Sequence, residues 1–198
     1  MRQWVQNLIT VPETPDIAYS VGAYTVICGN WANVGTLAHE FTHIMDLVAL
    51  TDYVNQPYAD LFSSQKRWQD PQARDLAVPT WYAATAWVEN FAEAGRVALS
   101  DMVVSGGLAS INKNASQVAN QISVFEQYSK GIMFPPGKTC TTRIISTDPV
   151  PVSGSIVPIV PASNAAPTAD VDGVSVIELP RNITYRKFVN PQKPAPRI

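Results

Sequence analysis

The chain contains only two histidines, His39 and His43, and both belong to the sequence His-Glu-Phe-Thr-His. Residues four apart lie on the same face of an α-helix, so two imidazoles at this spacing can bind one zinc ion. Glu40 lies between them, where it can act on a water molecule beside the metal. The motif therefore predicts a helix that carries two zinc ligands and the general base of a hydrolytic reaction.

The residues around the motif have the pattern of a core helix from about residue 33 to residue 50. Its apolar positions recur at helical spacing and are Val34, Leu37, Phe41, Ile44, Met45 and Val48. Uncharged residues also surround the histidines, as an enclosed metal site requires. The alternative for the motif alone is a solvated face of histidine and glutamate on a core helix.

Composition excludes two other classes of function. The 198 residues include 14 basic and 16 acidic ones, for a net charge of −2, and 46% are hydrophobic. This balance provides no basic stripe for nucleic acid, and no apolar run approaches the roughly 18 residues of a membrane span. We expect a globular, monomeric protein with one domain and some additional chain, which binds neither nucleic acid nor membrane.

Further elements are predicted along the chain. Residues 23–28 are β-branched and aromatic, which favours a short strand. Prolines in residues 11–15 favour a loop, and residues 51–79 are polar and irregular, as in a long excursion between helices. A second helix is expected from about Thr80, a possible cap, to Val104, and a third from about Ala109 to Lys130.

The C-terminal part has a different composition. Nine of the 16 prolines lie in residues 148–198, which predicts a flexible proline-rich tail in which residues 174–179 are compatible with one added strand. We therefore expect an N-terminal segment at 1–19, a catalytic domain at 20–147 and a tail at 148–198.

A third metal ligand is needed, because catalytic zinc sites usually have three protein ligands and a water molecule. Glu89 and Glu93 lie one turn apart on the second predicted helix, in an otherwise apolar setting. A carboxylate in such a setting needs a partner, and a metal or a ligand histidine provides one. The alternative is a pair of ordinary carboxylates on a helix surface, with ion pairs to residues such as Arg96.

The histidine motif, followed by Tyr82 and then by Glu89 and Glu93 in the spacing Tyr-x6-Glu-x3-Glu, resembles the catalytic domain of anthrax lethal factor and of its relatives, the Pro-Pro endopeptidases. The sequence of residues 78–93 is also similar to that of fungal secreted proteins described as conidiation-specific. The resemblance covers residues 20–143. It implies an α+β, zincin-like fold that is mostly helical with a small sheet, and zinc-dependent hydrolysis of peptide bonds in a peptide or protein substrate.

Carried over residue by residue, the resemblance implies that His39, His43 and Glu89 bind zinc. It also implies that Glu40 is the general base. A different class remains as the alternative: a secreted zinc-binding protein of spores or surfaces with little catalytic activity. Retention of Glu40 argues against it, since a structural site prefers four protein ligands and has no use for a base.

The resemblance also implies roles for residues that do not bind the metal. Glu93 accepts a hydrogen bond from a ligand histidine, which fixes the tautomer of that ring. Tyr82 donates a hydrogen bond to the oxyanion of the reaction, although a packing role beside Trp81 is equally open. Asp46, close to His43 on the same helix, is a weaker candidate for the role of Glu93.

Asp52 competes with Glu89 for the place of third ligand, because aspzincin peptidases use an aspartate within the pattern Gly-Thr-x-Asp-x-x-Tyr-Gly. Thr51 and Asp52 match only a fragment of it: Leu50 stands where the glycine belongs, and no Tyr-Gly follows. We therefore favour Glu89. By analogy with other zinc peptidases, the strand at residues 24–27 is expected to be an edge strand to which a substrate adds by backbone pairing.

Cysteine usage and two glycosylation sequons suggest an extracellular protein. Cys28 and Cys140 are expected to form a disulfide, and sequons occur at Asn114 and Asn182. Residues 1–7 lack the apolar core of a signal peptide, so we expect the chain to be a mature or truncated product.

Overall fold

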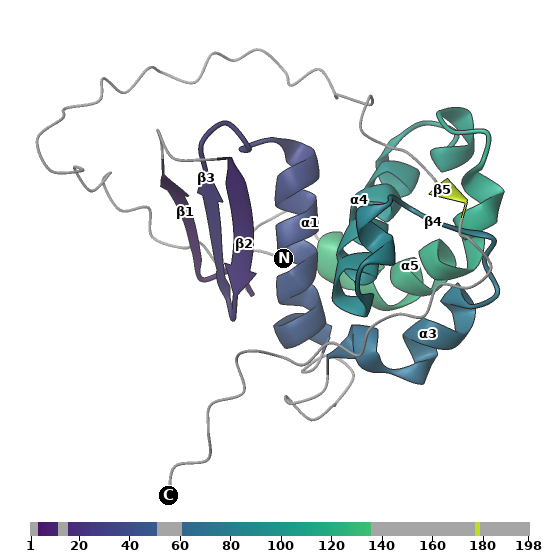
Figure 1. Ribbon diagram of the computed structural model, residues 1–198, viewed down its shortest axis with the longest axis horizontal. Coiled ribbons are helices and arrows are strands. Elements are labelled where there is room, and N and C mark those ends of the chain that lie inside the picture. Colours follow the sequence, from purple (N-terminus) through teal and green to yellow (C-terminus); the bar gives the residue numbers. More distant parts are fainter. Residues whose placement is uncertain (1–3, 12–15, 51–60, 136–176, 179–198) are drawn as a thin grey trace, which may run out of the picture.

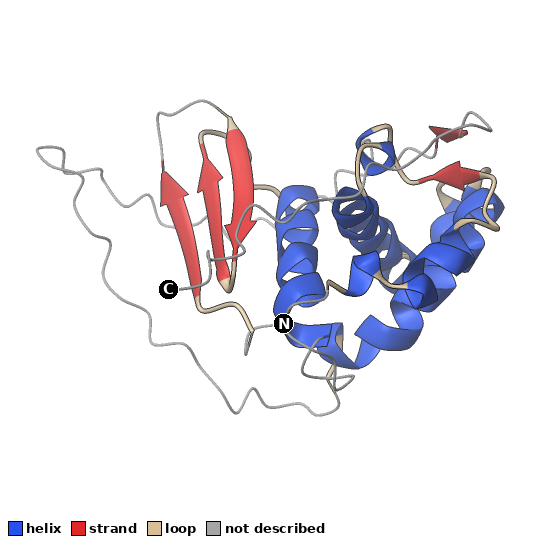
Figure 2. Cartoon of the chain, turned by 60° about the horizontal axis from the view of Figure 1, so that its bottom comes forward, coloured by secondary structure: helices blue, strands red, loops and turns tan. Residues whose placement is uncertain are grey.

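The computed structural model describes residues 4–11, 16–50, 61–135 and 177–178. Within these residues, four α-helices and a small mixed sheet of three strands form an α+β fold, as predicted. Helix α1 (Val34–Ile44) lies between the sheet and the other helices in both ribbon views (Figures 1 and 2). The helix with the histidine motif is therefore the central element of the molecule.

The sheet has the order β1-β3-β2, with β3 (Tyr24–Cys28) in the middle. β1 (Asn7–Val11) runs parallel to β3, and β2 (Ile17–Val21) runs antiparallel to it. β3 confirms the predicted strand, but its predicted position at an edge is wrong. The strands that flank it were not predicted, and β2 crosses the expected boundary between residues 19 and 20.

Helix α1 begins at an asparagine cap and continues beyond its regular part. The side chain of Asn33 accepts a hydrogen bond of 2.9 Å from the N–H of Thr36. After Ile44 the chain forms a π-helical turn, Met45–Ala49, a feature that often occurs near functional sites. Together the two segments confirm the predicted helix at about residues 33–50.

The next two predicted helices begin later than expected. α4 spans Trp87–Val103, since a short 3-10 turn, Tyr82–Ala84, comes before it, and the hydroxyl of Thr80 accepts a hydrogen bond from the N–H of Ala83 in that turn. α5 spans Ala119–Met133. Its start is fixed by Asp75, which accepts bonds of 2.8 to 2.9 Å from backbone N–H groups of its first turn. A capping residue so distant in sequence leaves no local signal.

The predicted irregular excursion at 51–79 is wrong for its described part. Helix α3 (Lys66–Gln72) forms there, and its Trp68 is fully buried against the ring of Phe91 on α4, with ring centroids 4.8 Å apart. The two-residue strand β4 (Ala77–Val78) follows and pairs with β5 (Ile177–Glu178). This pairing agrees with the added strand that residues 174–179 allow.

Helices α1 and α4 approach each other closely where Gly95 meets Thr42. A Cβ atom built at Gly95 would lie only 2.1 Å from the hydroxyl oxygen of Thr42, so only glycine fits at this position. The threonine hydroxyl turns back and donates to the carbonyl of Ala38 at 2.7 Å. The close approach places the first turns of α4 directly against the histidine motif.

We predict that Gly95→Ala destabilises the protein by about 1 to 3 kcal/mol through overpacking, although alanine favours a helix by about 1 kcal/mol over glycine. In a Thr42→Gly background the clash is gone, so the same Gly95→Ala change should become stabilising. Urea unfolding of the two single variants and the double variant measures both values. A Gly95→Ala change that stabilises in both backgrounds would show that the helices do not need this contact.

Candidate metal centre

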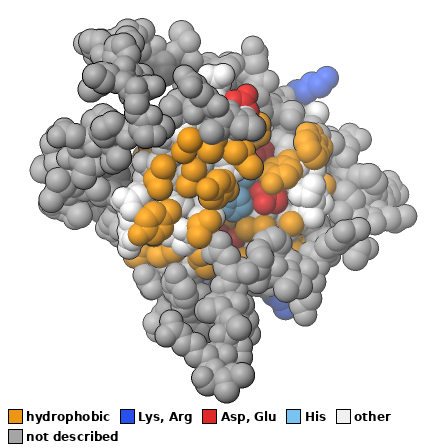
Figure 3. Space-filling model, turned by 60° about the vertical axis from the view of Figure 1, so that its left-hand side comes forward, with side chains coloured by type: hydrophobic (Ala, Val, Ile, Leu, Met, Phe, Trp, Pro, Cys, Tyr) orange, Lys and Arg blue, Asp and Glu red, His pale blue; other side chains and the backbone are white. Residues whose placement is uncertain are grey.

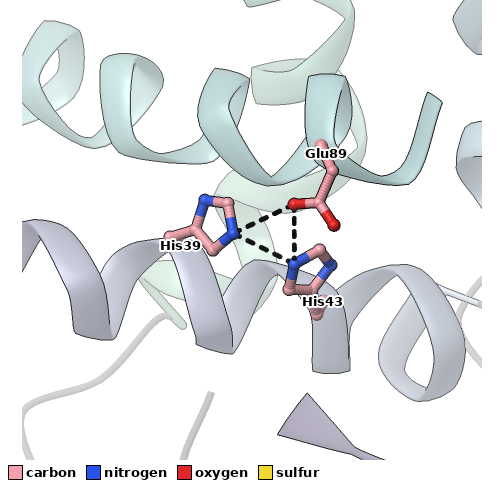
Figure 4. A group of neighbouring side chains, drawn as sticks. All are labelled: His39, His43 and Glu89. Carbon is pink, nitrogen blue, oxygen red and sulfur yellow. Dashed lines mark hydrogen bonds and ion pairs between the residues drawn. The ribbon is translucent and has the colours of Figure 1, made fainter. Parts of the chain in front are cut away.

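Three side chains converge between α1 and α4 (Figure 4). His39 and His43 come from α1, and Glu89 comes from the first turn of α4. The two Nε2 atoms are 3.1 Å apart, and the Oε2 atom of Glu89 lies 3.2 Å from that of His39 and 3.3 Å from that of His43. The three atoms thus form a nearly equilateral triangle.

The size of this triangle fits a metal ion. In a tetrahedral zinc site with nitrogen ligands at 2.0 to 2.1 Å, neighbouring ligand atoms are about 3.3 to 3.4 Å apart. The three measured separations are within about 0.3 Å of this value, so the atoms can occupy one face of a tetrahedron. The fourth corner is left for a water molecule or a substrate atom. His39, His43 and Glu89 can therefore hold a metal.

The hydrogen bonding of Glu89 supports the same conclusion. Its Oε2 atom is buried and has no hydrogen-bond partner among the described residues, although two ring nitrogens lie within 3.3 Å of it. The two Nε2 atoms are also too close for both to point N–H bonds into the space between them. When both Nε2 atoms are unprotonated, their lone pairs and that of the Glu89 oxygen converge on one point, which is the donor arrangement that a metal requires.

Glu93 lies behind His39, on the side away from the triangle. Its Oε1 atom is 2.7 Å from Nδ1 of His39, and because a carboxylate can only accept, Nδ1 is the donor. This bond leaves Nε2 as the metal-binding atom of the ring. Arg96 in turn donates from Nη1 to both oxygens of Glu93, at 3.2 and 3.3 Å. Sequence reasoning expected an arginine ion pair but not its link to the histidine.

The charges of the site are strongly coupled. Burial lowers the pKa of His39, but Glu89 and Glu93 outweigh it and raise this pKa to about 9. Burial raises the pKa of Glu89, but the two histidines outweigh it and lower this pKa to about 2. The pKa of Glu93 is also lowered, because His39 and Arg96 outweigh its burial. Without a metal, the cluster therefore holds a protonated imidazole between carboxylates, and metal binding displaces a proton.

Glu40 is buried, and it lines a cavity of about 720 Å³ that also reaches His39 and Tyr82. Ala18, Trp31 and Trp81 form other parts of its wall. Figure 3 shows a histidine side chain and acidic side chains at the surface between apolar ones. Burial raises the pKa of Glu40, against the opposing charges of His43 and His39. The carboxylate of Glu40 thus faces the same space as His39, one of the three residues that could hold a metal.

Tyr82 begins the 3-10 turn Tyr82–Ala84, and its ring centroid lies 5.8 Å from that of His39. Burial and the negative charge of Glu89 raise its pKa to about 12, so the phenol keeps its proton and can donate it to a hydrogen bond. The ring also packs edge-on against Trp81, with centroids 5.7 Å apart. Both roles considered from the sequence are therefore compatible with its position.

Asp46 has a different partner from the one expected. It is fully buried in the π-helical turn, and its two oxygens accept from the N–H and the hydroxyl of Ser63, at 2.8 and 2.7 Å. Burial raises its pKa to about 6. These bonds hold the 3-10 turn Phe62–Ser64 against the helix of the histidines, so the contacts of Asp46 support an indirect role.

Two expectations fall on residues that the structure does not describe. Asp52, the alternative third ligand, lies in the undescribed range 51–60. Cys140 lies in the range 136–176, while its expected partner Cys28 is buried at the end of β3 and has no disulfide partner among the described residues. The disulfide and the aspzincin alternative therefore stay predictions.

Fold and site together define a class of protein: an α+β protein in which three side chains from two helices could hold a metal ion. Comparison with models of protein families, with curated proteins and with solved structures finds no match to this chain. None of the helices in the described part combines the length and the apolar character that a membrane crossing requires.

Proposed function

We propose that the protein is a zinc-dependent metalloendopeptidase. The observation that carries this proposal is the position of Glu40, a buried base that shares a cavity with His39, beside three metal-binding side chains. A structural zinc site is closed by four protein ligands, whereas a catalytic site keeps one position open. Three ligands and a neighbouring base favour the catalytic kind.

Each group then has a defined task in hydrolysis. A zinc ion held by His39, His43 and Glu89 would polarise the carbonyl of the peptide bond and make a water molecule more acidic. Glu40 accepts a proton from the attacking water and passes it to the leaving nitrogen. Tyr82 donates a hydrogen bond to the oxyanion, and Glu93 keeps Nδ1 of His39 protonated.

The sheet offers a place for the substrate. Among the described strands β2 is an outer strand, which pairs with β3 alone, and its residues Ile17 and Ala18 line the cavity. An extended peptide can pair its backbone with the edge of an outer strand. We therefore propose that the substrate, a peptide or protein, pairs with β2 and not with β3. The proposal also includes that the protein is monomeric and extracellular.

Metal content and hydrolysis, measured together, test the proposal. The purified chain is analysed for zinc and for iron, because two histidines and a carboxylate also bind Fe(II) in oxygenases. Cleavage of a broad peptide library is then followed by mass spectrometry before and after chelation, and after zinc is restored. We expect one zinc per chain and cleavage that disappears and returns with it. One zinc with no cleavage would favour the alternative, a secreted zinc-binding protein of spores or surfaces.

A further inference from the structure

The hydroxyl of Ser20 connects the edge strand β2 to the carboxylate of Glu40. Its Oγ lies 2.9 Å from Oε2 of Glu40 and also 2.9 Å from the backbone carbonyl oxygen of the same residue. A third oxygen, Oγ1 of Thr25, lies 3.1 Å away on β3, at the position that pairs with Ser20 in the sheet. Sequence reasoning gave Ser20 no role.

The number of hydroxyl protons determines which group in this cluster donates a hydrogen bond and which accepts one. A serine hydroxyl has one proton to donate and two lone pairs that accept. Thr25 is fully buried and can give its own proton to Ser20, which leaves the proton of Ser20 for Glu40. Of the two acceptors on Glu40, the ionised carboxylate is the stronger, because charge roughly doubles the strength of a hydrogen bond.

From this arrangement we infer that Ser20 is a positioning residue, which holds the carboxylate of Glu40 in the orientation that accepts a proton from water. This inference rests on the proposed peptidase function. The serine hydroxyl lies equally far from the carboxylate and from the backbone carbonyl oxygen of Glu40, so it contacts this residue at two points.

Ser20 lies on the same strand as residues of the cavity wall. That strand is β2, which contributes Ile17 and Ala18 to the wall. Glu40 itself is only 4% exposed, and it lies on helix α1, which packs against β2. The base is thus oriented from the strand proposed to bind the substrate, and the metal ligands are oriented from α4.

The kinetic test compares Ser20→Ala with Ser20→Thr. We expect Ser20→Ala to lower kcat about ten-fold or more, as for loss of a hydrogen bond to a charged group, with KM and the zinc content unchanged. Ser20→Thr keeps the hydroxyl and should restore most of the rate. Ser100→Ala, which removes a hydroxyl bonded to a backbone carbonyl on α4, is the matched control and should leave kcat unchanged. A wild-type kcat in Ser20→Ala, or loss of its zinc, would overturn the inference.

A second measurement needs no activity. Urea unfolding of the metal-free protein, of Ser20→Ala, of Glu40→Ala and of the double variant gives a double-mutant cycle. We expect the unfolding constant of the double variant to differ about ten-fold from the value that independent effects predict. Independent effects would overturn the inference even if the protein cleaves peptides. If Ser20 and Glu40 are coupled in a protein that binds zinc but cleaves no peptide, the contact is supported and the proposed peptidase function is rejected.

Discussion

Glu40→Gln is expected to leave zinc binding intact and to lower kcat by about 10²- to 10⁴-fold, the usual contribution of a general base. Glutamine has nearly the same size and can still accept the hydrogen bond of Ser20, but it cannot take a proton from water. Because Glu40 is not among the three converging ligands, the metal site itself should not change.

Zinc per chain and cleavage of the best peptide substrate are measured for wild type and Glu40→Gln under the same conditions. Glu126→Gln, which changes a glutamate of α5, is the matched control and should behave as wild type. A Glu40→Gln variant with full zinc and full activity would exclude Glu40 as the base. If wild type and Glu40→Gln carry one zinc and are equally inert, the enzyme proposal fails.

The second large effect is expected at the third ligand. Glu89→Ala removes one of the three side chains proposed to bind the metal. Loss of a residue that only hydrogen-bonds to a ligand lowers metal affinity by up to about 100-fold, so we expect the zinc affinity to fall by more than this. The variant also leaves His39 and His43 as the only described side chains of the site. Competition with a chromophoric chelator measures the dissociation constant.

Two other variants show whether the loss of zinc affinity is specific to the third ligand. Glu93→Gln removes the carboxylate that accepts from Nδ1 of His39, and it should weaken zinc binding by about 10- to 100-fold, less than Glu89→Ala. Asp52→Ala should leave the affinity unchanged. Loss of zinc in Asp52→Ala together with wild-type affinity in Glu89→Ala would instead assign the third ligand as in the aspzincins.

Part of the site could be predicted from the sequence because its geometry is local. A spacing of four residues fixes the relative positions of His39 and His43 on any helix, and the apolar periodicity identifies that helix. Glu89 and Glu93 are also one turn apart, so their shared face could be predicted. That this face meets the histidines was implied by the resemblance alone, and in the structure it depends on the contact of Gly95 with Thr42.

Other parts could not be predicted because long-range contacts determine them. The start of α5 is set by Asp75, and the burial of Trp68 against α4 stabilises a helix in a segment of polar composition. The two outer strands are short and lie next to prolines, which obscured them. The alternation in Ile-Ala-Tyr-Ser-Val of β2 places Ser20 on the inner face, and it is the one local signal that points to this residue.

The division of the site between two helices has a consequence for metal binding during folding. Ser20, Glu40 and both histidines belong to one strand-strand-helix unit formed by neighbouring stretches of chain, whereas Glu89 belongs to a separate helix. Only docking of that second helix completes the set of ligands. Under the proposed function, we expect a partly unfolded chain to present two imidazoles and to bind zinc weakly, so that capture of the ion and formation of the native interface between the helices become a single event.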